Sequence, residues 1–167
     1  MKHAKNSGAR GCAGDGGLGS ALADTAFTAA SGPKCNDESK PELGLWTCPG
    51  PAGYVARFAD EGNMVSLTLA PAGSIAKARP TAQWRGAGQA FGDKVEWIIR
   101  SGVPRAAVIR TWRRPDDDER EIQELSVFAI DRERACTFAA VDIHQARANE
   151  IALAKAEEAA TARCPEK

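Results

Sequence analysis

VEWIIRSGVPRAAVIRTWR, residues 95–113, is the stretch that decides the fold of this chain. Val95, Trp97 and Ile99 recur at every second position, with Lys94, Glu96 and Arg100 at positions between and beside them, which is the period-2 pattern of a half-buried strand. Ser101-Gly102 then predicts a turn, because glycine tolerates backbone angles that tight turns need. The residues after the turn resume an extended pattern rich in arginine. The stretch therefore predicts an antiparallel hairpin.

Strand patterns continue on both sides of this hairpin. Residues 122–130 contain an unbroken apolar run that predicts burial on both faces, and residues 54–69 alternate around an Asp60-Glu61-Gly62-Asn63 turn. Residues 70–92 contain prolines, glycines and many alanines, and we expect a long surface connection anchored by Trp84 and Phe91. The remaining strands are expected at residues 25–29, 45–48, 105–113 and 135–141. We expect most of these segments to form one antiparallel sheet of about six strands.

The C-terminal region changes from a strand period to a helix period. Asp142 and Gln145 resemble a capping box, which would start a helix near Ile143. Residues 145–162 are rich in alanine, the strongest helix former. Small side chains recur on one stripe of this helix, so it could pack closely on one face of the sheet. The expected fold class is α+β.

Composition limits the partners that the chain can have. The 167 residues include 22 basic and 22 acidic side chains, and 43% are hydrophobic. A chain of zero formal charge has no electrostatic reason to bind nucleic acid or anionic lipid. No apolar run approaches the roughly 18 residues that a membrane span needs. We therefore expect one globular domain without a membrane span.

The N-terminus has two features of an export signal. Lys2 and Lys5 give a basic start, and Ala21-Leu22-Ala23 fits the small-x-small cleavage pattern. The segment between them is Gly-rich and contains charges, which makes it atypical. We interpret residues 1–23 as an atypical signal peptide or a disordered leader, and residues 24–167 as a single disulfide-stapled domain.

Four cysteines follow the leader, and the oxidising compartment that an exported chain enters would join them as disulfides. Four cysteines allow three connectivities. We favour Cys35–Cys48, which closes a short loop, and Cys136–Cys164, which joins the last strand to the end of the helix. The alternative is that all four are reduced, buried thiols.

Few residues carry recognisable chemistry. His3 lies in the leader, so His144 is the only histidine of the domain, whereas a metal site needs three or four converging ligands. We predict no metal and no cofactor. His144 is interpreted either as an exposed helix residue or as the catalytic group of a hydrolase.

One cluster combines basic and aromatic side chains. Arg110, Trp112 and Arg113 could bind an anionic or sugar-like ligand through stacking and charge-assisted hydrogen bonds. The alternative is that these arginines pair with Glu121 and Glu124 across the sheet. The sequence leaves both interpretations open.

The order of several motifs resembles a family of uncharacterised, small exported proteins of Gram-negative bacteria. Leu45-Trp46-Thr47-Cys48-Pro49-Gly50, Val95-Glu96-Trp97, and the late cysteines Cys136 and Cys164 carry the resemblance. It spans about residues 25–164. It implies export to the periplasm and two disulfides, and it implies no particular activity.

Residues 46–69 alone are similar to the opening of periplasmic lysozyme-inhibitor domains. The shared pattern is an aromatic-x-Cys strand, an alternating strand with Tyr54, and Val65-x-Leu67-x-Leu69 after an acidic turn. Those domains use a Ser-Gly loop and a lysine to block the lysozyme cleft, and Ser101-Gly102 is the matching dipeptide here.

These observations predict a non-enzymatic periplasmic or secreted module that binds or inhibits a cell-envelope protein. The alternative is a periplasmic hydrolase or ligand-modifying enzyme that uses His144.

Overall fold

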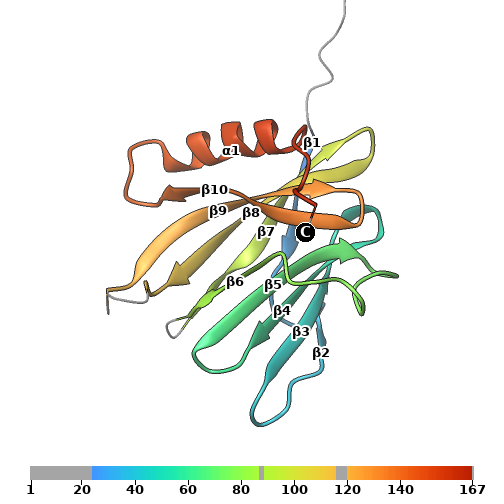
Figure 1. The fold of residues 1–167 in the computed structure, drawn as a ribbon, viewed down its shortest axis with the longest axis vertical. Helices are drawn as coiled ribbons and strands as arrows, with labels where there is room; N and C mark the ends of the chain where they lie inside the picture. Colours follow the sequence, from blue (N-terminus) through green and yellow to red (C-terminus); the bar gives the residue numbers. More distant parts are fainter. Residues whose placement is uncertain (1–23, 87–88, 116–119, 167) are drawn as a thin grey trace, which may run out of the picture.

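The computed structural model describes residues 24–86, 89–115 and 120–166 as a β-sandwich with one helix on its outside. Three layers are visible in Figure 1: a lower sheet, a central sheet and the C-terminal helix above it. The leader proposed for residues 1–23 lies outside the described residues. The mostly antiparallel β architecture with a C-terminal helix agrees with the expected fold class.

The central layer, which we call sheet A, has the strand order β1-β7-β8-β9-β10. All of its neighbouring strands are antiparallel. Its strands are β1 (Asp24–Ala29), β7 (Phe91–Arg100), β8 (Val103–Arg113), β9 (Ile122–Asp131) and β10 (Arg134–Asp142).

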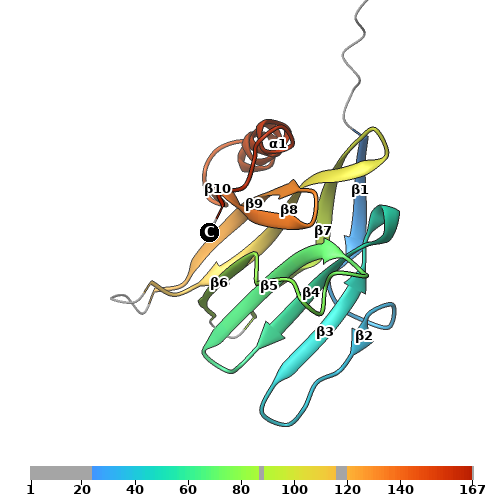
Figure 2. The same cartoon turned by 45° about the vertical axis from the view of Figure 1, so that its right-hand side comes forward.

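The lower layer, sheet B, has the strand order β2-β3-β4-β5-β6 and is also antiparallel. Its strands are β2 (Asn36–Asp37), β3 (Gly44–Pro49), β4 (Tyr54–Asp60), β5 (Met64–Pro71) and β6 (Ala82–Arg85). A short 3-10 helix, η1 (Pro51–Gly53), connects β3 and β4. Figure 2 shows the two sheets stacked face to face.

The expectation of a single sheet of about six strands was wrong, because the strands divide into two sheets of five. Alternation of apolar and polar residues indicates that a strand has a buried face, but it does not indicate which strand lies beside it. The division follows the need to bury both faces of β9. Phe128 and Ile130 face sheet B, whereas Val127 and Ala129 face the helix, and all four are at most 2% exposed.

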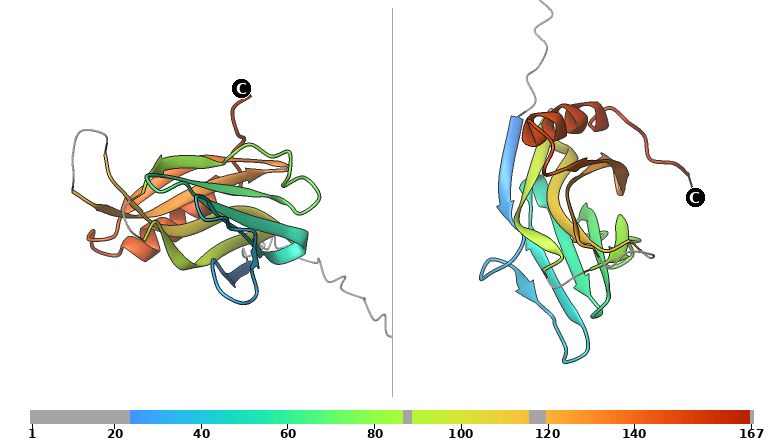
Figure 3. Two further views of the ribbon diagram at one scale, coloured as in Figure 1. Left: turned by 90° about the horizontal axis from the view of Figure 1, so that it is seen from below. Right: turned by 90° about the vertical axis from the view of Figure 1, so that its left-hand side faces the viewer.

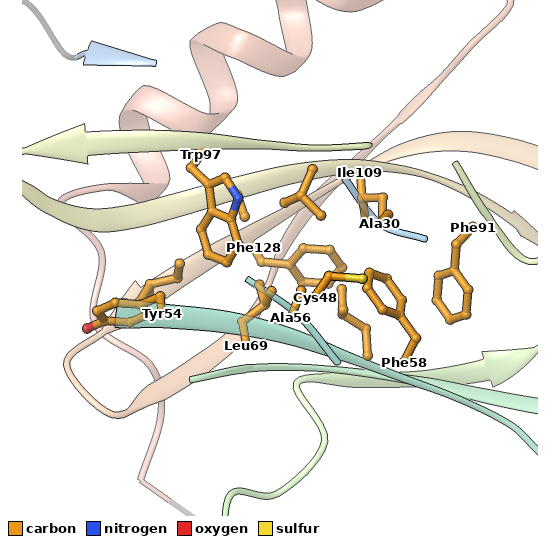
Figure 4. Close-up of a cluster of buried hydrophobic side chains, with 14 of the residues drawn as sticks. Ala30, Cys48, Tyr54, Ala56, Phe58, Leu69, Phe91, Trp97, Ile109 and Phe128 are labelled. Atoms are coloured by element: carbon orange, nitrogen blue, oxygen red, sulfur yellow. The ribbon is translucent and has the colours of Figure 1, made fainter. Parts of the chain in front are cut away.

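The core between the sheets is aromatic. Phe58 and Phe91 meet edge to face at 4.8 Å between ring centroids, and Trp46 stacks on Phe58 at 5.5 Å. Trp97 is fully buried, and its indole N–H donates a 2.7 Å hydrogen bond to Oγ1 of Thr28 on the neighbouring strand. Figure 4 shows Phe58, Phe91 and Trp97 in the space between the two layers. The contact between Phe58 of β4 and Phe91 of β7 joins sheet B to sheet A.

The helix α1 (Ala148–Ala159) covers the other face of sheet A, mainly over β8, β9 and β10. Its buried face consists of Ala148, Ala152, Ala156 and Ala159. Small side chains let the helix axis lie close to the strands. Figure 3 shows the helix on the side of sheet A that faces away from sheet B.

The helix begins later than the capping-box pattern predicted. Asp142 accepts a 2.9 Å hydrogen bond from the backbone N–H of His144, so it stabilises a turn after β10 instead of a helix start. Arg147 then adopts a left-handed conformation with φ of 60° immediately before the helix. Local side chain–backbone bonds of Asp compete with helix formation, which explains the five-residue delay.

Two disulfides staple the domain, and they are the pairs favoured from the sequence. Cys35–Cys48 joins the loop before β2 to β3, and Cys136–Cys164 joins β10 to the segment after α1. Intramolecular disulfides are consistent with an oxidising, extracytoplasmic location.

The region 70–92 was expected to be a surface connection, but it contains strand β6 and the start of β7. Trp84 lies on β6, and its indole N–H donates to the backbone carbonyl of Trp112 at 3.0 Å. Its ring also meets Phe91 edge to face at 5.1 Å. The anchoring role expected for Trp84 and Phe91 is therefore present, within a strand and not a loop.

Candidate functional site

A groove lies on the face of sheet A that α1 covers only in part. Its volume is about 890 Å³, and it opens where β7 begins and β8 ends. Its apolar lining includes Phe27, Val108, Trp112, Leu125 and Leu153. Its polar lining consists of Gln89, Asp93, Lys94, Glu96, Arg110, Asn149 and Glu150. Strands of sheet A form the floor, and the first half of α1 forms one wall.

Strand alternation and register place these side chains together. Val108 packs with the helix, so Arg110 and Trp112, two and four residues further along β8, lie on that same face. Glu96 of β7 is opposite both Val108 of β8 and Phe27 of β1. Residues from three neighbouring strands therefore line one surface.

Each aromatic ring of the groove carries a cation over it. The Nζ atom of Lys94 lies 5.1 Å from the ring centroid of Phe27, and the Cζ atom of Arg110 lies 5.8 Å from that of Trp112. Such pairs hold long, flexible side chains over aromatic surfaces. Phe27 is 58% exposed, more than the other exposed large hydrophobic residues of the described chain.

Charges of both signs meet in the groove. Burial raises the pKa of Glu96, and the nearby ammonium of Lys94 opposes this shift. Glu150 at the start of α1 forms an ion pair with Arg147. The lining therefore offers carboxylate oxygens, ammonium and guanidinium donors, and the amides of Gln89 and Asn149 side by side.

The structure separates the three residues predicted to bind a ligand. Arg110 and Trp112 line the groove together, as the ligand interpretation requires. Arg113 follows the alternation of Ile109, so it lies on the face toward sheet B. There its Nε and Nη2 each donate a 2.9 Å bond to the two carboxylate oxygens of Glu124, which is the cross-strand pairing that the sequence left open.

Sequence reasoning missed most of the groove. Phe27, Lys94, Glu96 and Asn149 lie in three separate segments, and no local pattern connects them. The one usable signal was Phe27, a large aromatic residue in an otherwise small and polar segment. Its partner across the sheet, Glu96, follows only from the β1–β7 register.

His144 lies in the exposed turn between β10 and α1 and is not part of the groove lining. Among the described residues, no group of three or more His, Cys, Asp or Glu side chains could hold a metal ion. Within the same ranges, no helix is long and apolar enough to cross a membrane.

Comparison of the chain with protein-family models, curated proteins and solved structures finds no match.

Proposed function

We propose that this chain is an exported binding module of the cell envelope and that the groove between α1 and β1 is its ligand site. The exposed ring of Phe27 carries this proposal, because it lies at a concave surface next to a second aromatic–cation pair. Exposed apolar surface that is rimmed by polar groups is typical of interaction sites. The volume of about 890 Å³ is in the range of small-ligand pockets, about 300–1,000 Å³.

The proposed compartment is the periplasm or the extracellular medium. Two disulfides support it, together with the basic start and the Ala21-Leu22-Ala23 cleavage pattern. Peptide mass mapping of protein recovered from its host tests this directly. We expect an N-terminus at Asp24 and both disulfides, and an intact Met1 with free thiols would contradict export.

A matched pair of variants tests the groove. Wild-type protein, Phe27→Ala and Phe138→Ala are each immobilised and exposed to a cell-envelope fraction, and the retained molecules are compared by mass spectrometry. Phe138 is the control because it is also an exposed aromatic residue, but it lies on β10 outside the groove. We expect Phe27→Ala to lose a component that the other two proteins retain. Equal retention by all three would contradict the proposal.

Inhibition of a lysozyme is a second candidate function, and one observation favours it. Ser101 and Gly102 form the exposed tip of the β7–β8 hairpin, with φ of 51° and 74°. The register puts this tip at the opposite end of the hairpin from the groove, because Arg100 pairs with Val103 and Phe91 pairs with Thr111. The two candidates therefore use different surfaces.

A lysozyme assay separates the candidates. Inhibition that is lost in Ser101→Trp and retained in Phe27→Ala would assign the activity to the hairpin tip. Full lysozyme activity at a stoichiometric excess of the wild-type protein would remove this candidate.

A further inference from the structure

We infer that the ligand of the groove is a neutral oligosaccharide, an inference that rests on the proposed binding function. Three properties of the groove support it: the chemistry of its polar lining, the separation of its aromatic rings and the backbone of its floor strands, which already pair with neighbours on both sides.

The polar lining suits hydroxyl groups better than a charged ligand. Asp93, Glu96 and Glu150 contribute three carboxyl groups, and Lys94 and Arg110 contribute two cations. An anion would face the carboxylates and a cation would face the basic groups, and each would be repelled by part of the lining. A sugar hydroxyl both donates and accepts, so it can use carboxylate, amide and guanidinium groups together.

The aromatic rings are placed to contact more than one sugar ring. Phe27 and Val108 are both opposite Glu96, on the two sides of β7, so two strand spacings of roughly 10 Å in total separate β1 from β8. Trp112 lies four residues further along β8, roughly 13 Å from Val108. Lys94 and Arg110 each lie over one face of these rings, yet Phe27 still has 58% of its surface exposed. Exposed aromatic surface can pack against the C–H faces of pyranose rings, and two aromatic side chains this far apart fit an oligosaccharide and not a monosaccharide.

An extended peptide fits this groove less well. Peptides that bind along a sheet obtain affinity from backbone hydrogen bonds to an exposed strand edge. The floor here is β7 and β8, and each of these strands is already paired with a neighbour on both sides. The edge strand β1 forms the rim of the groove, so its unpaired edge is directed away from the floor. A ligand in the groove must therefore be recognised by side chains.

The test is an NMR titration of the full chain, labelled with ¹⁵N, with defined tetrasaccharides. The neutral probes are cellotetraose, maltotetraose, mannotetraose and fully N-acetylated chitotetraose, and the charged counterpart is tetragalacturonate. We expect at least one neutral probe to shift the amide signals of β7 and β8 at the groove in a saturable way. Trp112→Ala should weaken that binding at least tenfold, and Phe138→Ala should leave it unchanged.

A second groove variant protects the test against misfolding of Trp112→Ala. Arg110 is exposed, so Arg110→Ala is expected to keep the fold and to weaken binding of the same probe several-fold. Arg79→Ala, an exposed arginine in the connection between β5 and β6, is the matched control. If Arg110→Ala binds as the wild type does, the inference is wrong.

Other outcomes would also overturn it. Tighter binding of tetragalacturonate than of every neutral probe would show that the groove selects charge. No saturable shift with any neutral probe at millimolar concentration would exclude this ligand class. Suppose that no neutral probe binds, but Phe27→Ala fails to retain an envelope component that the wild type retains. The groove then remains the binding site, and only the ligand class is wrong. If Phe27→Ala retains everything that the wild type retains, the proposed function is wrong as well.

Discussion

Replacing Gly50 by alanine should destabilise the domain, because the new methyl group would enter the space of a buried tryptophan ring. A Cβ atom at this position would lie 2.7 Å from Cζ2 and 3.0 Å from Cε2 of Trp97, and 3.1 Å from the backbone oxygen of Tyr54. Trp97 cannot easily move away, since it is 0% exposed and its indole N–H is bonded to Thr28. The backbone of Gly50, with φ of −115°, is open to any residue, so the effect isolates the steric clash.

The magnitude follows from two opposing terms. Overpacking a well-filled core costs about 1–3 kcal/mol. Alanine also restricts the unfolded chain, which stabilises the folded state by about 0.4–1 kcal/mol. Because the ring is held on several sides, we expect a net loss of about 1–2 kcal/mol, and a fall in Tm of about 4 °C for each kcal/mol in a domain of this size.

Urea unfolding followed by tryptophan fluorescence, without reductant, measures this loss. Gly73→Ala is the matched control, because a methyl group at Gly73 would meet no atom within 4 Å and the φ of Gly73 is not positive. Trp97→Phe removes the indole atoms that give the two shortest contacts and leaves only the contact with the Tyr54 oxygen. The double variant with Gly50→Ala should therefore be more stable than the sum of the single losses predicts. Additive losses, or a Gly50→Ala variant as stable as Gly73→Ala, would refute the reasoning.

Three further predictions concern the disulfide, an ion pair and a groove carboxyl. Replacing Cys136 and Cys164 by alanine should cost about 3–4 kcal/mol in urea unfolding, since the bond closes a loop with a sequence separation of 28, and a loss below about 1 kcal/mol would contradict this. Arg113→Lys should lower stability by at most about 1 kcal/mol, because the arginine side chain of the bidentate ion pair with Glu124 is 38% exposed. Thermal unfolding should show no comparable loss for the control variant Arg110→Lys. Burial raises the folded-state pKa of Glu96 above its ordinary value of 4.5, so its contribution to stability is full below that pH and is lost as the pH rises through the raised pKa. In urea titrations, Glu96→Gln should therefore gain stability relative to the wild type as the pH rises above 4.5, and a pH-independent difference would be inconsistent with the burial of this carboxyl.

The local features of this chain were determined by its sequence. The β4–β5 and β7–β8 hairpins and the burial of both faces of residues 122–130 follow from patterns within short stretches, whereas the two cysteine pairs were favoured among three possible connectivities. Period-2 alternation and turn residues act between near neighbours, so no distant contact is needed to recognise them. The helix itself was also predictable, although a local bond to Asp142 moved its start to Ala148.

The division into two sheets and the groove were decided by the tertiary structure alone. β1 pairs with β7, more than sixty residues away, and nothing in either segment specifies that partner. The groove depends on this pairing, because it brings Phe27 of β1 opposite Glu96 of β7 and so places β1 at the rim of the groove. Pairing between distant strands is chosen by how well whole faces pack, and that free energy is a property of the assembled core and not of any single stretch of sequence.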